Sequence, residues 1–407
     1  MTHPALAGQP VYLDYNASTP VDPEVLEAAL PYLTTHFGNP SSGHSYARAP
    51  RAALDQSRDQ VAGLLGTTPG EIVFTGGGSE ADTLAIRGVA LGSRGAEAGR
   101  RRIVTLATEH PAVLRSCDSL RADGFTVTLL PVNGHGRVDP DDLQAAVRAE
   151  PTALVSIAYG NSETGTLQPI AELAAIAHTD GALFHTDAAQ AAGKVAIDVD
   201  ALQVDLLTMV GHKMYAPKGV GALYVRSGTP LHPVVHGGGQ ERGLRAGTEN
   251  VAFIAALGRA AELAHRELPG SAVRLAALRD LLHAELEAAL PGRVLLNGHP
   301  TERLPGTLNV SIDGVSGRAL LAAVPEIAAS TGSACHEGVD APSPVLLAMG
   351  LPAERALAAL RLSLGRWSTD QEIRQAARLI AEAAATSPGP WEKSAPQKRE
   401  KPQGGLR

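Results

Sequence analysis

Two stretches decide the fold of this chain: Ala182–Gln190, which reads ALFHTDAAQ, and Asp205–Lys213, which reads DLLTMVGHK. Each begins with a short apolar run that is typical of a buried β-strand and ends in polar residues. Asp187 follows the first run and Lys213 follows the second. In α/β sheets, ligands bind at the carboxyl ends of the strands. The pattern therefore predicts that Asp187 and Lys213 belong to one ligand site.

The same pattern, short apolar runs that alternate with helical segments, extends from about residue 70 to residue 226. Asp139 and Pro140 read as an N-cap and a first helical residue, and Ile170–His178 has the apolar spacing of a packed helix. The alternation of strands and helices predicts an α/β fold with a mostly parallel seven-stranded sheet. The five further strand candidates are Glu71–Thr75, Ile103–Ala107, Phe125–Val132, Ala153–Ala158 and Gly221–Arg226.

The pattern changes after about residue 265. A long helix is predicted over Ser271–Leu290, followed by mixed short strands and helices. This indicates a smaller α+β domain that the N-terminal residues join. The predicted division is a large domain over residues 21–264, a small domain made of residues 1–20 and 265–386, and a disordered tail. The tail, residues 387–407, is rich in Pro, Lys, Gly and Gln.

Composition narrows the functional class. The 407 residues carry a net charge of -7, which gives no indication of a nucleic-acid or anionic-membrane partner. Apolar stretches are interrupted before the length of roughly 18 residues that a membrane span needs. The N-terminus has no basic start or apolar core, so no secretion signal is expected. The two cysteines, Cys117 and Cys335, fit a reducing compartment. We therefore expect a soluble cytoplasmic protein.

Polar residues follow three of the predicted strands. Gly76–Ser79 could cradle a phosphate at a helix start, or Ser79 and Asp82 could form a plain capping box. His110 could stack on a planar cofactor or be purely structural. Asn161 lies in a polar loop and could equally be a turn residue.

Asp187 and Lys213 are the candidates for binding and reacting with a cofactor. A carboxylate that ends a buried strand needs a cationic partner, and a protonated pyridine nitrogen is such a partner. A desolvated lysine has a lowered pKa and can form a Schiff base. The alternative for Lys213 is an ordinary surface lysine that closes a strand.

The two cysteines differ in their surroundings. Cys335 lies in a polar loop of small residues next to His336, where a thiol can be exposed and activated. Cys117 lies in a helical stretch, Ala112–Leu120, and reads as a buried small hydrophobe. No second Cys/His cluster completes a four-ligand metal set, so no metal is expected.

At this point the sequence resembles the cysteine desulfurase and selenocysteine lyase family, which has the class V aminotransferase fold. The matching segments run in order from residue 12 to residue 366. They are Tyr12–Ala17, Gly38–Ser42, Thr75–Glu80, Glu109-His110, Asn161–Gly165, His185–Gln190, Gly211–Lys213, Gly237–Asn250, Gly332–Cys335 and Arg361–Arg366.

The resemblance implies a homodimer of fold type I with pyridoxal 5'-phosphate as cofactor. Lys213 is implied to form the Schiff base, Asp187 to pair with the ring nitrogen, His110 to stack on the ring, and Gln190 to contact the ring hydroxyl. The implied phosphate ligands are Gly78, Ser79, His212 and, from the other subunit, Thr248.

The resemblance also implies the reaction. Asn161, which also contacts the cofactor, and Arg361 bind the substrate carboxylate, and a planar guanidinium suits that task. Lys213, His110 and Cys335 are implied to be catalytic, with Cys335 as the nucleophile. The product is L-alanine from L-cysteine, with a persulfide on Cys335 for a sulfur-acceptor protein, as in iron–sulfur cluster assembly.

Three alternatives remain open at this stage. Val210 stands where many desulfurases have a phosphate-binding serine, and selenocysteine lyases are similar to this chain there and over Pro342–Leu347. The Gly-Gly-Gly run before Ser79 also departs slightly from the desulfurase pattern. A selenocysteine lyase is therefore the first alternative. A class V aminotransferase has no need of Cys335, and a protein that only stores sulfur has no need of the lysine, aspartate and histidine together.

Overall fold

The large sheet contains all seven predicted strands. The computed structural model describes residues 3–92, 98–332 and 341–386. The strands lie in the order β2-β8-β7-β6-β5-β3-β4. Their bounds are Ile72–Thr75 (β2), Arg102–Leu106 (β3), Thr126–Leu130 (β4), Leu154–Ser156 (β5), Leu183–Asp187 (β6), Leu206–Val210 (β7) and Gly221–Val225 (β8). The predicted α/β class is confirmed.

Strand direction brings the predicted site residues to one edge of this sheet. Strands β3 to β7 pair in parallel, while β8 pairs antiparallel with both β7 and β2. Strand β2 therefore runs in the same direction as β7. The carboxyl ends of β2, β3, β5, β6 and β7 consequently meet at the same edge.

Helices cover both faces of the sheet. One hydrophobic core contains residues of α2 (Arg48–Leu65), α5 (Pro140–Ala149) and α6 (Ile170–Thr179), and another contains residues of α3 (Gly78–Leu91) and α4 (Pro111–Ser119). Both local predictions for helices are confirmed. The side chain of Asp139 caps α5 by accepting from the N–H of Asp141, and Cys117 is buried in α4.

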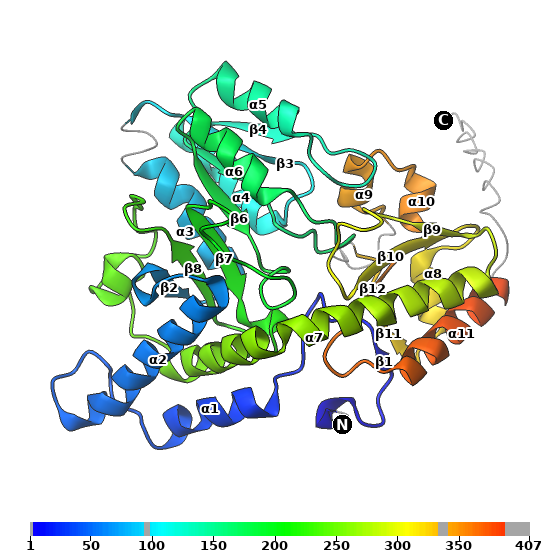
Figure 1. Cartoon of the computed structure of the whole chain (residues 1–407), viewed down its shortest axis with the longest axis horizontal. Coiled ribbons are helices and arrows are strands. Elements are labelled where there is room, and N and C mark those ends of the chain that lie inside the picture. The colour runs from blue at the N-terminus through cyan, green and yellow to red at the C-terminus, as the bar shows by residue number, and fades with distance from the viewer. Residues whose placement is uncertain (1–2, 93–97, 333–340, 387–407) are drawn as a thin grey trace, which may run out of the picture.

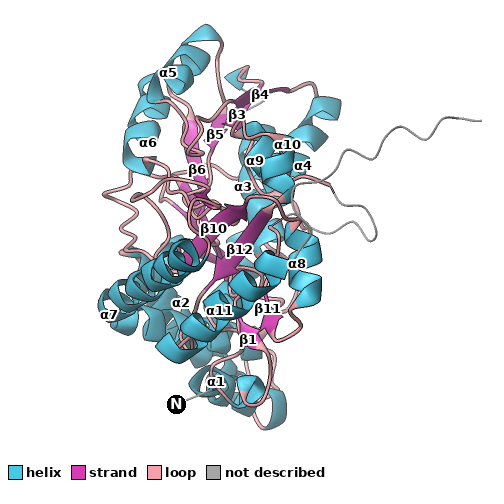
Figure 2. Cartoon of the chain, turned by 90° about the vertical axis from the view of Figure 1, so that its right-hand side faces the viewer, coloured by secondary structure: helices cyan, strands magenta, loops and turns pink. Residues whose placement is uncertain are grey.

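A second layer system lies beside the first. Three antiparallel strands, in the order β12-β10-β9, pack against α8 (Gly317–Ala323) and α11 (Asp370–Thr386) around a separate core (Figure 2). Near the N-terminus, β1 pairs in parallel with β11. The remaining bounds are Val11–Tyr12 (β1), Val294–Leu296 (β9), Thr307–Ile312 (β10), Ile327–Ala328 (β11), Ala359–Ser363 (β12), Pro23–Thr34 (α1), Pro344–Ala348 (α9) and Ala353–Leu357 (α10).

One long helix connects the two systems. Helix α7 spans Val251–Ala289, and Figure 1 shows it running from α2 at one end to α11 at the other. The predicted start at Ser271 was wrong, because the helix continues through Pro269. Leu257 packs in the core of the large sheet and Leu282 packs in the second core, so burial at both ends outweighs the local cost of the proline.

The predicted division between residues 264 and 265 falls inside this helix and stays a prediction. The predicted disordered tail, residues 387–407, lies outside the described residues.

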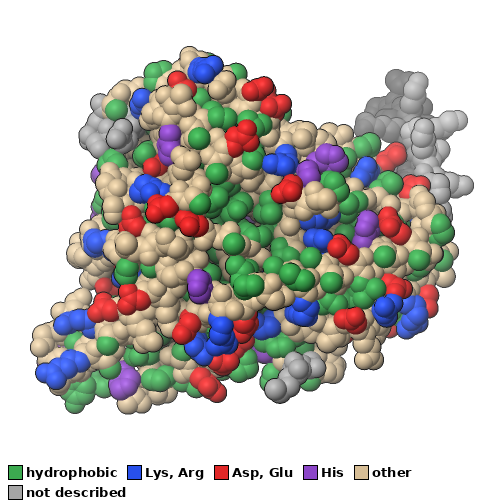
Figure 3. Space-filling model, viewed as in Figure 1, with side chains coloured by type: hydrophobic (Ala, Val, Ile, Leu, Met, Phe, Trp, Pro, Cys, Tyr) green, Lys and Arg blue, Asp and Glu red, His purple; other side chains and the backbone are tan. Residues whose placement is uncertain are grey.

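The surface gives two further observations. None of the described helices combines the length and the apolar character needed to cross a membrane. On the face shown in Figure 3, basic and acidic side chains are interspersed.

Two glycine substitutions test the packing where the two layer systems meet. A Cβ added at Gly365 would overlap the buried ring of Tyr15, which cannot move aside. We expect Gly365→Ala to lower the stability by about 1–3 kcal/mol through overpacking. Gly270 lies inside α7 with open space around it, so Gly270→Ala should raise the stability by about 0.4–1 kcal/mol. Thermal unfolding followed by circular dichroism measures both. Equal midpoints for the two variants would contradict the packing argument.

Candidate active site

Lys213 is held by the N-terminal segment. It ends the short helical turn Gly211–Lys213 after β7, and its Nζ donates to the carbonyl oxygens of Asn16 (2.5 Å) and Ala17 (2.8 Å). Burial, reinforced by the positive charge of Arg361, lowers the pKa of Lys213 to about 8. Lys213 is partly buried and donates two hydrogen bonds to the backbone. The alternative that it is an ordinary surface lysine is therefore wrong.

Asp187 and His110 lie within electrostatic reach of Lys213. Asp187 ends β6 and is buried, which raises the pKa of its carboxyl; one oxygen accepts from the N–H of Ala189 at 2.9 Å. The ring of His110 caps α4 by accepting from the N–H of Ala112 at 3.2 Å. Loss of water around this ring lowers the pKa of His110, and the charges of Asp187 and Lys213 act on it as well.

The glycine run ends at an uncapped helix start. The N-cap of α3 is Gly77, which has no side chain, so the alternative of a Ser79 capping box is wrong. Ser79 is exposed, and a Cβ on Gly78 would lie 3.0 Å from a methyl group of Val210. The first N–H groups of α3 are therefore without a side-chain cap, as in anion-binding helix starts. Burial, together with the positive charges of Lys213 and Lys218, lowers the pKa of His212 to about 4.

Asn161 shapes the loop after β5. Its side-chain oxygen accepts from the N–H groups of Glu163 and Thr164, each at 2.9 Å, and its amide nitrogen donates to the carbonyl of Thr108 at 3.1 Å. Its role as a turn residue is confirmed. Its predicted contacts with cofactor and substrate stay predictions.

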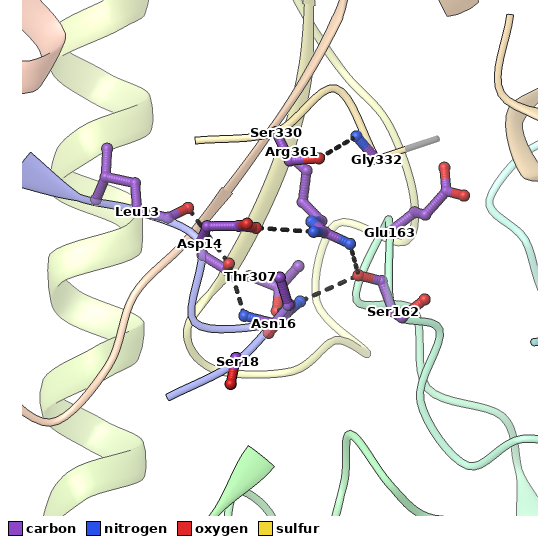
Figure 4. Close-up of polar contacts among 12 residues, drawn as sticks. Leu13, Asp14, Asn16, Ser18, Ser162, Glu163, Thr307, Ser330, Gly332 and Arg361 are labelled. Atoms are coloured by element: carbon purple, nitrogen blue, oxygen red, sulfur yellow. Dashed lines mark hydrogen bonds and ion pairs between the residues drawn. The ribbon is translucent and has the colours of Figure 1, made fainter. Parts of the chain in front are cut away.

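Arg361 reaches the site from β12. Its guanidinium pairs with Asp14 at 2.8 Å and donates to the carbonyl of Ser162 at 3.3 Å (Figure 4). Its Nε is buried and has no hydrogen-bond partner among the described residues. A buried guanidinium with an unused donor suits a carboxylate ligand. The strand position also links Arg361 to Ser330 through two backbone hydrogen bonds.

Two predicted residues are not brought into this cluster. Thr248 is exposed in the loop before α7, and its hydroxyl makes no hydrogen bond within the part of the chain that the structure describes. Cys335 lies outside the described residues.

The chain is similar to known proteins over most of its length. The family model described as "Aminotransferase class-V" matches residues 11–375. The chain belongs to the class V aminotransferase family. The family predicted from the sequence is confirmed.

Curated and solved members of this family are similar over nearly the whole chain. A "Cysteine desulfurase" of Trichormus azollae is 46% identical over 374 residues, which cover 91% of this chain and 92% of the relative. A "Cysteine desulfurase IscS" of Anaeromyxobacter dehalogenans is also 46% identical and covers 92% of each chain. The solved structure titled "NIFS-LIKE PROTEIN" is 35% identical, covers 93% of this chain and all of its own, and has a TM-score of 0.85.

The residues at the sheet edge fit the cofactor predicted for a class V aminotransferase. Asp187 is a buried acid that a ring cation can balance, and the uncapped start of α3 offers donors to a phosphate. Lys213 has an amine of lowered pKa beside them. This donor set suits a planar cationic ring that carries a phosphate.

Sequence reasoning missed three residues of this class V site. Asp14 and Asn16 lie in the segment Tyr12–Ala17, which carried the resemblance, but no role was predicted for either. Lys194 was missed entirely, although it stands four residues after Gln190, a spacing that can bring two side chains together.

The lowered pKa of Lys213 gives a direct prediction. Burial and nearby positive charge disfavour the ammonium form, so in the folded, cofactor-free protein Lys213 should lose its proton around pH 8, against an ordinary value of 10.5. Trace acylation across pH, read by peptide mass spectrometry, measures this. The unfolded chain is the control, in which reactivity should return toward the ordinary range. An unshifted profile in the folded protein would contradict the described environment.

Proposed function

We propose that this protein is a pyridoxal-phosphate-dependent cysteine desulfurase that converts L-cysteine to L-alanine. The observation that carries the proposal is the position of Lys213 and the buried Asp187 at the carboxyl ends of two adjacent parallel strands, within electrostatic reach of one another. The 46% identity to two proteins named cysteine desulfurase supports the sulfur substrate.

The residues divide the work of holding the cofactor. Lys213 would hold it covalently, Asp187 would balance the ring nitrogen, and His110 would cover the ring face. Gln190 would contact the ring hydroxyl. The phosphate of the cofactor would bind to Gly78, Ser79, His212 and the partner subunit's Thr248. When bound, pyridoxal phosphate supplies an electron sink for the bonds of the substrate amino acid.

Arg361 and Cys335 would bind the substrate and attack its sulfur. Arg361 would bind the substrate carboxylate through its guanidinium, with Asn161 beside it. The Cys335 thiolate attacks the substrate sulfur, so an S–S bond forms and the C–S bond breaks. The electron pair left on the substrate carbon takes up a proton, which gives alanine. Cys335 keeps a persulfide for transfer to a sulfur-acceptor protein.

A homodimer follows from the same proposal. Thr248 is exposed rather than turned to its own site, as a residue serving a partner's cofactor would be. Helix α1 adds an exposed stripe of Leu26, Leu30 and Leu33, which are 48%, 45% and 59% exposed. An apolar stripe at this spacing supports contact with another protein surface.

The covalent role of Lys213 is tested by colour. The purified protein should absorb visible light, and Lys213→Ala should lose that band and at least about a thousandfold of alanine formation, as expected when a covalent catalytic group is removed. Lys218→Ala, at a neighbouring exposed lysine, is the matched control and should keep both. A colourless wild type that cannot be reconstituted would remove the whole proposal.

The sulfur chemistry is tested at Cys335. Cysteine sulfur needs a nucleophile to take it, whereas selenium leaves more easily. We therefore expect Cys335→Ala to stay coloured and to form no alanine from cysteine. The alternative, a selenocysteine lyase, is supported by Val210 packed against Gly78 where a phosphate-binding serine is absent. It predicts that the variant retains selenium release. Alanine formed from each substrate distinguishes the two, and undiminished release from cysteine would refute the persulfide step.

A further inference from the structure

Lys194 lies behind the site in a setting that the mechanism above does not use. Its Nζ donates to the side-chain oxygen of Gln190 at 2.7 Å and to that of Asn16 at 3.3 Å. Within the described residues it forms no salt bridge, so its partners are neutral amides. Because both partners are neutral, Lys194 does not balance a negative charge here, and its hydrogen bonds instead fix the two amide side chains.

The surroundings make this lysine an unusual cation. Lys194 and Lys213 both line a cavity of about 480 Å³. The acidic residue among the described lining is Glu267, which pairs with Arg366 at 3.0 Å. Burial, with the charges of Lys213 and Arg361, lowers the pKa of Lys194 to about 7. The ammonium form is therefore disfavoured, and it is this form that can only donate to the two amide oxygens.

The hydrogen bond from Lys194 decides which way the Gln190 amide faces. An ammonium can only donate, so the end of the amide that meets it is the oxygen. The NH₂ end then points away and donates to the carbonyl oxygen of Asn16 at 2.9 Å. The same carbonyl accepts from Lys213, so the NH₂ of Gln190 lies on the Lys213 side.

Asn16 is fixed by the same lysine. Its side-chain oxygen receives Lys194, while its NH₂ donates to the carbonyl of Ser162 (3.2 Å) and the hydroxyl of Thr307 (2.9 Å). Its backbone carbonyl is thereby held in place for Lys213 and Gln190. Lys194 thus binds the side chains of both Gln190 and Asn16, the two residues that meet at the carbonyl that accepts from Lys213.

We propose that Lys194 is a positioning residue that orients the Gln190 amide, so that its NH₂ rather than its oxygen faces Lys213 and the ring hydroxyl of the cofactor. The inference rests on the proposed function. Without Lys194, the amide of Gln190 can turn, and its oxygen, an acceptor, then faces the ring oxygen, which needs a donor when it is ionised.

The test compares Lys194→Met with wild type in the cofactor-loaded enzyme. The pH at which the visible absorption of the bound cofactor changes should shift, because the donor to its ring oxygen is no longer fixed. We expect kcat to fall about tenfold, the size of one hydrogen bond to a charged group, with KM for cysteine nearly unchanged. Lys194→Arg keeps a donor-only cation and should retain most of the wild-type pH profile. Lys218→Met is the matched surface control and should behave as wild type.

A double-mutant cycle identifies the route. If Lys194 acts through Gln190, Lys194→Met should add nothing in a Gln190→Leu background. Additive losses, or an unchanged absorption profile in Lys194→Met, would overturn the inference. Should Lys194→Met not fold, the Arg variant and the Gln190→Leu profile decide the question. A wild type that binds no cofactor would instead refute the proposed function, and does so before any variant is compared.

Discussion

The amine of Lys213 is held by two backbone carbonyls of a segment almost two hundred positions earlier in the chain. That segment is tied to the second layer system: Asp14 pairs with Arg361, and the N–H of Asn16 donates to the hydroxyl of Ser363. The strand that presents Arg361, the proposed ligand of the substrate carboxylate, therefore also positions the segment that receives the lysine. The site exists only when the N-terminal residues lie between the two sheets, so its geometry depends on both cores being formed.

Long-range contacts of this kind separate what the sequence predicts from what it does not. The seven strands and the residues after them were predictable because short apolar runs and their alternation with helical patterns can be recognised locally in the sequence. Asp14 was not, because its partner Arg361 lies far away in the chain. Lys194 was missed although its partner Gln190 stands only four residues before it, because its second partner, Asn16, is distant in the chain. The start of α7 was also misjudged. The helix was predicted to begin at Ser271, but the burial of Leu257 and Leu282 on either side of Pro269, which the sequence does not reveal, keeps it continuous from Val251.

Beneath the site lies a buried acidic layer. Burial raises the pKa of Asp187 and of Asp82, and it raises that of Glu109 to about 8. Next to them His185 is fully buried and bonded to Ser156 and Thr208, and burial lowers its pKa to about 3. Burial in this layer favours the neutral forms of these acids. A cationic ring beside Asp187 would stabilise its charged form, because burial otherwise penalises that charge.

Arg361 connects substrate binding to the state of Lys213. Its positive charge is one of the causes that lower the pKa of Lys213. A substrate carboxylate on the guanidinium cancels part of that charge, so the proton affinity of the Lys213 amine rises when the substrate is bound. This rise in proton affinity would favour the proposed reaction. The Lys213 amine, once released from the cofactor in the presence of substrate, would be a better base. Under the proposed function, Arg361 would serve both recognition of the carboxylate and tuning of the lysine, and Asp14, which pairs with the guanidinium, would contribute to both.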